Sequence, residues 1–231
     1  FNHGTSVAAI IHAVVPNASI LDMKVLDDAG NGTEEDVVLA LEACARLLDT
    51  NPNLAPNIIN MSLGSPDDNN PDNPLRVASR AVMSRGIVIV AAAGNNGEVF
   101  GAVTTPACEK YVVAIGSISS SPFLISEFSS RGPTLAGLIK PDAVFLGEDI
   151  ILASSVSDIS TIAKSGTSFS TPLTTGVIVL TMEGVVRTQT IPPEMFVGKN
   201  VITSIVAIDN MLPVVCTKPE GAPAGKDNDY G

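Results

Sequence analysis

Uninterrupted runs of apolar residues recur along this chain at long spacing. Runs in which apolar and polar residues do not alternate are typical of strands covered on both faces, as in a parallel sheet. The predicted strands are Ser19–Leu26, Ile58–Leu63, Ile87–Ala92, Tyr111–Ile115 and Ile150–Ala153.

Between these runs, apolar residues fall at helical spacing. The predicted helices are Ser6–Val14, Glu34–Leu48 and Pro74–Arg85, and another apolar helix follows Ser168. Thr33 is a suitable N-cap for the second helix, because the acidic residues after it complement the helix dipole. Strands that alternate with helices predict an α/β fold with a doubly wound, mostly parallel central sheet and helices on both faces.

The pattern weakens toward the C-terminus. We expect one domain over residues 1–190 and a partly irregular C-terminal extension over residues 191–231. Within the extension, Val201–Ile208 is a candidate strand. The tail after Pro213 is rich in Pro, Gly, Lys and Asp and is expected to be poorly ordered.

Composition narrows the function classes. The net charge of −11 argues against a nucleic-acid partner, which would require a basic surface. The stretch Ser165–Met182 is too rich in Ser and Thr to predict a membrane span. The three cysteines, Cys44, Cys108 and Cys216, form no zinc pattern, and we expect no disulfide framework. No glycine loop that would cradle a phosphate is visible, which disfavours an intracellular nucleotide-binding protein.

Ser168 is the best candidate nucleophile in the sequence. It lies in Ser165-Gly-Thr-Ser-Phe-Ser-Thr-Pro172, at the start of the apolar helix. The first turn of a helix offers free N–H groups and the positive end of the dipole, which suit a hydroxyl that must become an alkoxide. Ser and Thr are also common helix caps, so this motif alone leaves both interpretations open.

Two other polar residues stand at the boundaries of predicted elements. His3 precedes an apolar helix and is either a catalytic base or a structural histidine. Asn95 follows the strand Ile87–Ala92, and open α/β sheets place their sites at strand ends. Its side-chain amide could donate to an oxyanion, although Gly94-Asn-Asn-Gly97 also suits a simple turn.

Several motifs stand in a characteristic order along residues 1–182. They are His3-Gly-Thr5, Asn60-Met-Ser-Leu-Gly64, Ala92-Ala-Gly-Asn95, Phe128-Ser-Ser-Arg-Gly-Pro133, Lys140-Pro-Asp142 and Ser165-Gly-Thr-Ser168 with Thr171-Pro172. In these motifs the chain resembles the subtilisin-like serine proteases, a family that hydrolyses peptide bonds with a Ser-His-Asp triad.

The resemblance implies a role for each matching residue. His3 would be the general base and Ser168 the nucleophile, while the Asn95 side chain and the Ser168 N–H would bind the oxyanion. The substrate would pair as an added strand with segments that border the cleft. These substrate-binding residues are Ser62, Leu63, Gly64, Ala92, Ala93 and Gly94.

The resemblance also implies a secreted protein that acts on a peptide or protein substrate, requires no cofactor and binds structural calcium in some members. The loop with Asp67, Asp68 and Asp72 offers oxygen ligands for calcium. A solvated acidic loop is the alternative interpretation of these three residues.

One member of the triad has no counterpart in the expected place. The family aspartate lies on a first strand before the histidine, whereas only Phe1 and Asn2 precede His3. We expect this strand and its aspartate to belong to an upstream segment of the same protein. Asp28 and Asp209 each follow an apolar run and are the alternatives, the second in a circularly permuted arrangement.

Smaller departures surround the candidate nucleophile: Phe169-Ser170, Leu173 and Phe145-Leu-Gly147 replace the usual family residues.

The sequence leaves two hypotheses for the function of the chain. The chain is the larger part of an active endopeptidase, or it is a non-catalytic subtilase-like module that binds peptide or is structural. Without the triad aspartate, we expect kcat to fall by about 10⁴. We also expect the isolated chain to be unstable, because apolar sheet edges stay uncovered.

Overall fold

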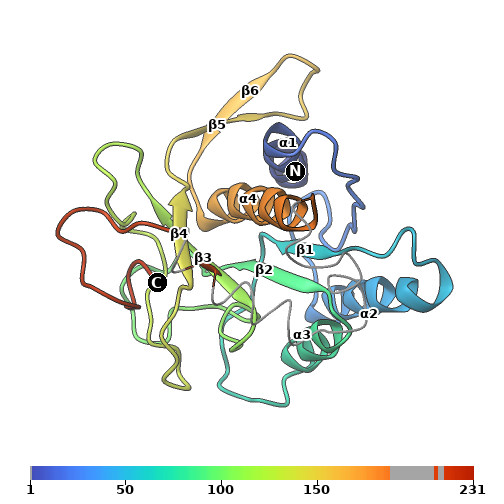
Figure 1. Ribbon diagram of the computed structural model, residues 1–231, viewed down its shortest axis with the longest axis horizontal. Coiled ribbons are helices and arrows are strands. Elements are labelled where there is room, and N and C mark those ends of the chain that lie inside the picture. The colour runs from blue at the N-terminus through green and yellow to red at the C-terminus, as the bar shows by residue number, and fades with distance from the viewer. Residues whose placement is uncertain (1, 188–210, 213–215) are drawn as a thin grey trace.

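The computed structural model describes residues 2–187, 211–212 and 216–231. Figure 1 shows a central sheet with helices on both of its faces, α1 and α4 on one side and α2 and α3 on the other. This arrangement confirms the predicted doubly wound α/β class. Among the described helices, none is long and apolar enough to cross a membrane.

Four parallel strands form the sheet, in the order in which they occur along the chain. They are β1 (Ile58–Met61), β2 (Val88–Ala92), β3 (Val113–Ile118) and β4 (Ala143–Leu146). Asn60 lies opposite Val90, and Ala92 lies opposite Ile115. Because all four strands run in the same direction, their carboxyl ends meet at one side of the sheet, where the candidate residues follow β1 and β2.

The helices are α1 (His3–Val14), α2 (Glu34–Thr50), α3 (Pro74–Ser84) and α4 (Thr167–Arg187). Thr33 caps α2 as predicted, since its side chain accepts from the Asp36 N–H while Asp36 accepts from the Thr33 N–H. Asn73 caps α3 by accepting from the N–H groups of Leu75 and Arg76. The four helices predicted from the sequence are therefore confirmed.

The central strand β2 shows why the apolar runs are continuous. Ile89 and Ala91 pack in the core under α2 and α3, whereas Val88 and Val90 pack with Ile178 of α4 on the opposite face. Neighbouring residues of β2 therefore face two different cores, and every one must be apolar.

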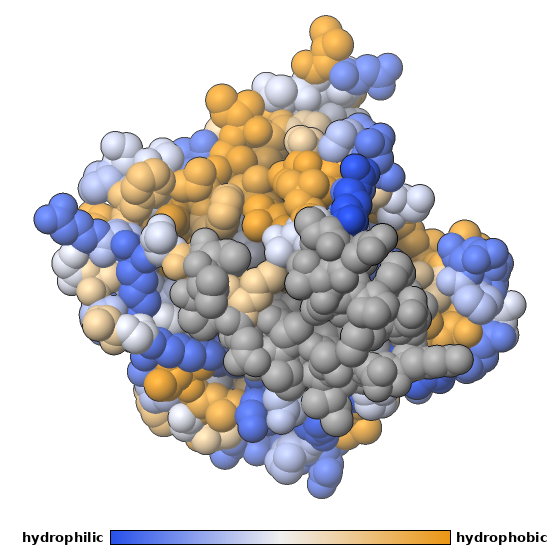
Figure 2. Space-filling model, viewed as in Figure 1, coloured by the Kyte–Doolittle hydropathy of each residue, from blue (hydrophilic) through white to orange (hydrophobic). Residues whose placement is uncertain are grey.

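The predicted strand Ile150–Ala153 does form, as β5, but it does not join the parallel sheet. It pairs antiparallel with β6 (Thr161–Lys164) to make a separate hairpin. Ile151 on this hairpin is 76% exposed, and Figure 2 shows hydrophobic side chains gathered over the hairpin and the helices beside it. Only Leu152 of this run is buried, so the run is not covered on both faces and its expected place in the parallel sheet is wrong. Strands β4 and β6 were not predicted.

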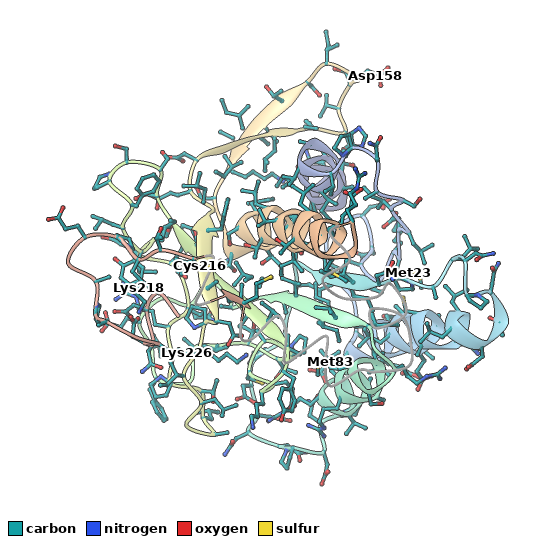
Figure 3. The ribbon with its side chains drawn as sticks, viewed as in Figure 1. Met23, Met83, Asp158, Cys216, Lys218 and Lys226 are labelled. Carbon is teal, nitrogen blue, oxygen red and sulfur yellow. The ribbon has the colours of Figure 1, made fainter. Side chains whose placement is uncertain are left out.

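The predicted strand Ser19–Leu26 is wrong, because this segment has no regular structure. Ile20, Leu21 and Met23 are exposed there, and Figure 3 shows Met23 on the same side of the molecule as β1 and α2. A strand requires a neighbour for its backbone hydrogen bonds. Within the described residues, this run has no strand beside it, and β1 forms the edge of the sheet.

The tail also differs from the expectation that it is poorly ordered. Residues 216–231 lie against the entry to β4, where Lys226 pairs with Asp142 at 2.6 Å and the Gly132 N–H donates to the Asn228 carbonyl at 3.0 Å. Figure 3 shows Lys218 and Lys226 together on this segment. The charges that suggested a solvated tail instead form ion pairs. The candidate strand Val201–Ile208 lies outside the described residues.

Candidate active site

Ser168 is the second residue of α4 and is held against the end of β1. Its hydroxyl donates to the Ser62 carbonyl at 3.1 Å, and the Ser62 hydroxyl donates back to the Ser168 carbonyl at 2.7 Å. As a first-turn residue, Ser168 has an N–H with no carbonyl four residues earlier in the helix to accept from it. The pair of hydrogen bonds fixes the position of Ser168 relative to the end of β1.

Polar side chains behind Ser62 extend this attachment into the core. The Thr175 hydroxyl on α4 donates to Asn60 Oδ1 at 2.9 Å, and Asn60 Nδ2 donates to the Ser62 hydroxyl at 3.0 Å. β1 and α4 are therefore joined by a continuous hydrogen-bond chain that ends at the Ser168 backbone. Such a chain holds Ser168 in one position relative to the sheet.

Asn95 follows β2 and faces the same helix turn. Its Oδ1 accepts from both the N–H and the hydroxyl of Thr167, each at 2.9 Å. The Thr167 hydroxyl also accepts from the Gly94 N–H at 3.3 Å. With the amide oxygen committed to Thr167, the amide nitrogen remains as the donor, beside Ser168.

His3 is the first residue of α1 and reaches the same turn of α4. Its ring lies 5.6 Å from the ring of Phe169, the residue after Ser168. Burial lowers the pKa of His3 below the usual 6.5, and the positive charge of Lys164 lowers it further. Both effects favour the neutral imidazole, the form that can accept a proton.

The residues around His3 connect α1 to the hairpin. Lys164 Nζ on β6 donates to Asn2 Oδ1 at 2.7 Å, and Asn2 Nδ2 donates to the Ser154 hydroxyl at 3.1 Å. The Ser6 hydroxyl donates to the Ala153 carbonyl at 2.8 Å. The position of His3 thus depends on the hairpin, whereas the position of Ser168 depends on the sheet.

A cleft of about 260 Å³ opens beside Ser168. Its lining comes from the residues after β1, the end of β2 with the residues after it, the connection from β2 to β3, and the start of α4. The lining residues are Leu63, Gly64, Pro66, Ala92, Gly94, Asn95, Asn96, Thr104, Thr167 and Ser168. Four of the predicted substrate-binding residues line it. Ser62 and Ala93 lie behind it, both buried.

The sequence analysis missed Pro66, Asn96, Thr104 and Thr167 as residues of the cleft. Thr167 belongs to the Ser-Gly-Thr-Ser motif, so that motif could have identified it. Thr104 stands in Val103-Thr-Thr-Pro106, which carries no recognisable signal for a site.

The acidic residues considered as alternatives have other partners. Asp28 pairs with Lys24 at 2.9 Å on the surface, and Asp209 lies outside the described residues. In the acidic loop, Asp67 pairs with Arg76 at 3.4 Å, and Asp68 accepts from the Asn73 amide. Across the described ranges, no group of three His, Cys, Asp or Glu side chains is placed to hold a metal ion. Calcium binding stays a prediction.

Comparison with known proteins agrees with this geometry. A family model described as the subtilase family (Peptidase_S8) matches residues 1–211. Serine protease AprX of Bacillus subtilis is 32% identical over 201 residues, 78% of this chain and 46% of that protein. Subtilisin DY of Bacillus licheniformis is 37% identical over 145 residues, 58% of this chain and 48% of its own. The chain therefore spans about half the length of the curated relatives that it matches.

Solved structures show the same fold. Sphericase superposes with a TM-score of 0.78 at 23% sequence identity, and the match covers 100% of this chain and 76% of the sphericase chain. A cold-adapted subtilisin-like serine proteinase superposes with a TM-score of 0.74 at 25% identity, covering 99% of this chain and 73% of its own. By the family model and these relatives, the chain, in which Ser168 and Asn95 meet at the ends of parallel strands, belongs to the subtilase family of serine proteases.

Proposed function

We propose that this chain carries the nucleophile, the general base and the oxyanion donor of a serine endopeptidase. The observation that carries the proposal is the meeting of three elements at one turn of α4. Ser168 comes from that turn, Asn95 hydrogen-bonds to Thr167 beside it, and His3 of α1 lies against Phe169 on its other side. Residues far apart in the sequence thus meet around one turn of α4.

In the proposed reaction, Ser168 Oγ attacks the scissile carbonyl carbon while its proton moves to the neutral imidazole of His3. The carbonyl oxygen becomes an oxyanion that accepts from Asn95 Nδ2 and the Ser168 N–H. The C–N bond then breaks, and His3 returns the proton to the leaving amine. Water hydrolyses the remaining ester by the same proton transfers in reverse, which regenerates the serine.

The carboxylate that orients His3 is proposed to come from an upstream segment of the same protein, as a strand added at the free edge of β1. Two features of the described residues support this. Ile58 and Ile59 of β1 stay half-buried, whereas their register partners Val88 and Ile89 on β2 are fully buried. The apolar segment 19–26 also leaves Ile20 and Leu21 about half exposed, at 45% and 46%. A strand between them would cover both and would end at the side of the sheet where His3 lies.

The proposed substrate is an extended peptide that pairs with residues 62–64 and 92–94, and the proposed location is extracellular, as is usual in the family. The uncharged cleft beside Ser168 supports a peptide substrate, because backbone pairing gives affinity and a side-chain pocket gives selectivity.

A fluorophosphonate probe tests the proposal, because it labels a serine only when that serine is activated. We expect labelling of the protein produced with its natural upstream residues, and loss of labelling in Ser168→Ala. The matched control is Ser165→Ala, three residues earlier and exposed, which should keep full labelling. Well-folded protein that is not labelled at Ser168 contradicts the enzyme and favours a non-catalytic module that binds peptide.

A further inference from the structure

We infer that the tail, residues 216–231, holds in place the loop that carries Asn95, and that the Arg131 side chain connects the two. Arg131 is then a positioning residue for Asn95. The inference rests on the proposed function for the role of Asn95 in the reaction. It goes further by assigning a role to the tail, which lies beyond the residues that the family model matches.

Loop 94–98, which carries Asn95, begins just beyond the end of β2. Asn95, Asn96 and Glu98 are exposed, so burial in the core does not fix them. An oxyanion donor must be positioned to within a fraction of an ångström. The loop therefore requires polar contacts from a neighbouring segment.

Segment 128–132 supplies these contacts. Four hydrogen bonds join it to loop 94–98. They run from the Gly97 N–H to the Phe128 carbonyl at 2.8 Å, from the Ser130 N–H to the Gly94 carbonyl at 2.9 Å, from the Asn96 N–H to the Ser130 hydroxyl at 3.1 Å and from the Arg131 N–H to the Gly97 carbonyl at 3.3 Å. Ser130 is fully buried, so water does not compete for its two hydrogen bonds. The position of the loop thus follows the position of segment 128–132.

The Arg131 side chain extends this connection to the tail. Its Nη1 donates to Glu98 Oε2 in the loop at 2.8 Å, and its Nε forms an ion pair with Asp229 Oδ1 in the tail at 3.7 Å. The Arg131 side chain is only 20% exposed, so its charge is screened less than that of a fully exposed arginine. One cation therefore attracts a carboxylate of the loop and a carboxylate of the tail.

The tail can hold Arg131 because the tail is itself anchored to the sheet. Lys226 pairs with Asp142, just before β4, at 2.6 Å. The Asp142 side chain is 4% exposed, and its other oxygen accepts from the Ala114 N–H of β3 at 2.8 Å. Figure 1 shows the tail, in red, beside the loops between β3 and β4. The anchor is therefore a buried carboxylate that is fixed by a central strand.

A second contact brings the tail directly against segment 128–132. The Gly132 N–H donates to the Asn228 carbonyl at 3.0 Å. A Cβ atom added to Gly132 would lie 2.6 Å from Asn228 Oδ1, which is below van der Waals contact. The tail and the segment therefore pack closely at the residue that follows Arg131.

Together these contacts form one path from the sheet to the loop. It runs from β3 through Asp142 and Lys226 into the tail, and from the tail through Arg131 to loop 94–98. Partly exposed ion pairs each stabilise a protein only modestly. We therefore expect loss of the path to loosen the loop by a moderate amount without unfolding the chain.

Amide hydrogen exchange tests the path without requiring turnover. The double variant Lys226→Met/Asp229→Asn removes the two charges through which the tail pairs with the rest of the protein. In the protein with its natural upstream residues, we expect the Gly97 and Arg131 N–H groups to exchange about fivefold faster in this variant, while the N–H groups of β2 are unchanged. Unchanged exchange at Gly97 overturns the inference.

Arg131→Met tests the positioning role by kinetics. We expect kcat for peptide hydrolysis to fall roughly fivefold with KM unchanged, because a displaced oxyanion donor affects the transition state and not substrate binding. In the Asn95→Leu background, the same substitution should change kcat by less than about 1.5-fold, because a residue that acts through Asn95 then has no donor to position. An equal loss of kcat in both backgrounds overturns the positioning role.

Arg85→Met is the matched control. Arg85 follows α3, pairs with Asp49 at 2.6 Å and has a side chain that is 41% exposed. This variant removes a paired arginine far from the tail, so kcat and the exchange of the Gly97 N–H should not change. Effects equal to those of Arg131→Met would overturn the inference, because they would follow from the loss of any paired arginine.

The outcomes distinguish this inference from the proposed function. If Ser168 takes no fluorophosphonate while exchange at Gly97 rises in the tail variant, the enzyme is contradicted and the hold of the tail on the loop stands. If Ser168 is labelled and exchange at Gly97 does not rise, the enzyme stands and the role of the tail is overturned.

Discussion

The candidate site has two halves that are built very differently. The nucleophile half, which consists of Ser168, Thr167, Asn95 and Ser62, is held by hydrogen bonds between α4 and the ends of β1 and β2. The base half, which consists of His3, Asn2 and Lys164, is held by the packing of the His3 ring on Phe169 and by polar contacts to the hairpin. The nucleophile half is attached to the buried sheet, and the base half is attached to the hairpin at the periphery.

The difference shows what each half needs for chemistry. A nucleophile and an oxyanion donor must be positioned to within a fraction of an ångström, and a buried sheet supplies that rigidity. A base must also be held in one tautomer and orientation, which a carboxylate normally does. Among the described strands β1 forms the edge of the sheet, and segment 19–26 leaves Ile20 and Leu21 about half exposed, which is where the proposal adds a strand with the orienting carboxylate.

The largest expected effect is on the base half. Producing the protein with its natural upstream residues should raise kcat for peptide hydrolysis about 10⁴-fold over residues 1–231 alone, because the base then gains its orienting carboxylate. Steady-state hydrolysis of one chromogenic peptide by both proteins measures this ratio. Equal activity of the two proteins would show that the base half is complete as it stands.

Leu21 provides a stability control for the same comparison. In residues 1–231 alone, Leu21→Ser should change the free energy of unfolding by less than about 0.5 kcal/mol, because the side chain is exposed. In the longer protein, the same substitution should cost about 1–2 kcal/mol, because the added strand would cover Leu21. Urea titrations of the four proteins give the difference, and an equal cost in both backgrounds argues against a strand at this edge.

The next largest effect is expected in the nucleophile half. Asn95→Leu should lower kcat by about 10²–10³ with little change in KM, a loss known for an oxyanion-hole asparagine in a subtilisin. The matched control is Asn96→Ala, which removes the neighbouring amide that donates to the Ala102 carbonyl. If the two substitutions lower kcat equally, Asn95 acts through the local loop and not through the oxyanion.

A smaller effect is expected at Thr167, which acts as a positioning residue through Asn95. Thr167→Val removes the hydroxyl that donates to Asn95 Oδ1 but keeps the backbone N–H that donates to the same atom. Loss of the hydrogen bond to Asn95, about 1 kcal/mol, should lower kcat roughly fivefold and leave KM unchanged. The longer hydrogen bond from the Gly94 N–H, at 3.3 Å, is lost with the same hydroxyl. Thr167→Ser should restore kcat. A rise in KM in Thr167→Val would instead indicate damage to the cleft.

The nucleophile half was also the more predictable one from sequence. Ser168 and Asn95 lie next to regular elements whose apolar patterns are strong, and strand ends and helix starts are the places where parallel sheets present side chains. Thr104 could not be found in this way. Its place in the cleft depends on the approach of Gly64 and Gly94 from two other segments, and a single sequence does not reveal such an approach.

The errors in the fold have a related cause. Ser19–Leu26 and Ile150–Ala153 have the apolar composition of buried strands, yet the first has no strand beside it among the described residues and the second pairs in a separate hairpin. An apolar composition indicates that a segment can form a strand, but tertiary structure decides which strand it pairs with. The tail 216–231 shows the opposite error. Its charged composition suggested poor order, yet its charged residues pair with Asp142 and with each other.

The smallest expected effect concerns the charge beside the base. Burial and the Lys164 cation both lower the pKa of His3, burial more strongly. Lys164→Met should therefore raise this pKa, but not above the usual 6.5, because burial remains. NMR titration of the imidazole resonances measures the change, with His3→Gln to assign them and Lys24→Met, a surface lysine paired with Asp28, as the control.

The same pKa shift also decides how the contribution of His3 to folding stability depends on pH. Since the pKa of His3 is lower in the folded chain than in the unfolded one, its contribution to stability is present above pH 6.5 and is lost as the pH falls through the folded value. Lys164→Met should narrow that window and move the acid limb of kcat/KM to higher pH. An unchanged pKa in Lys164→Met would show that the hairpin holds the base half in place without tuning its charge.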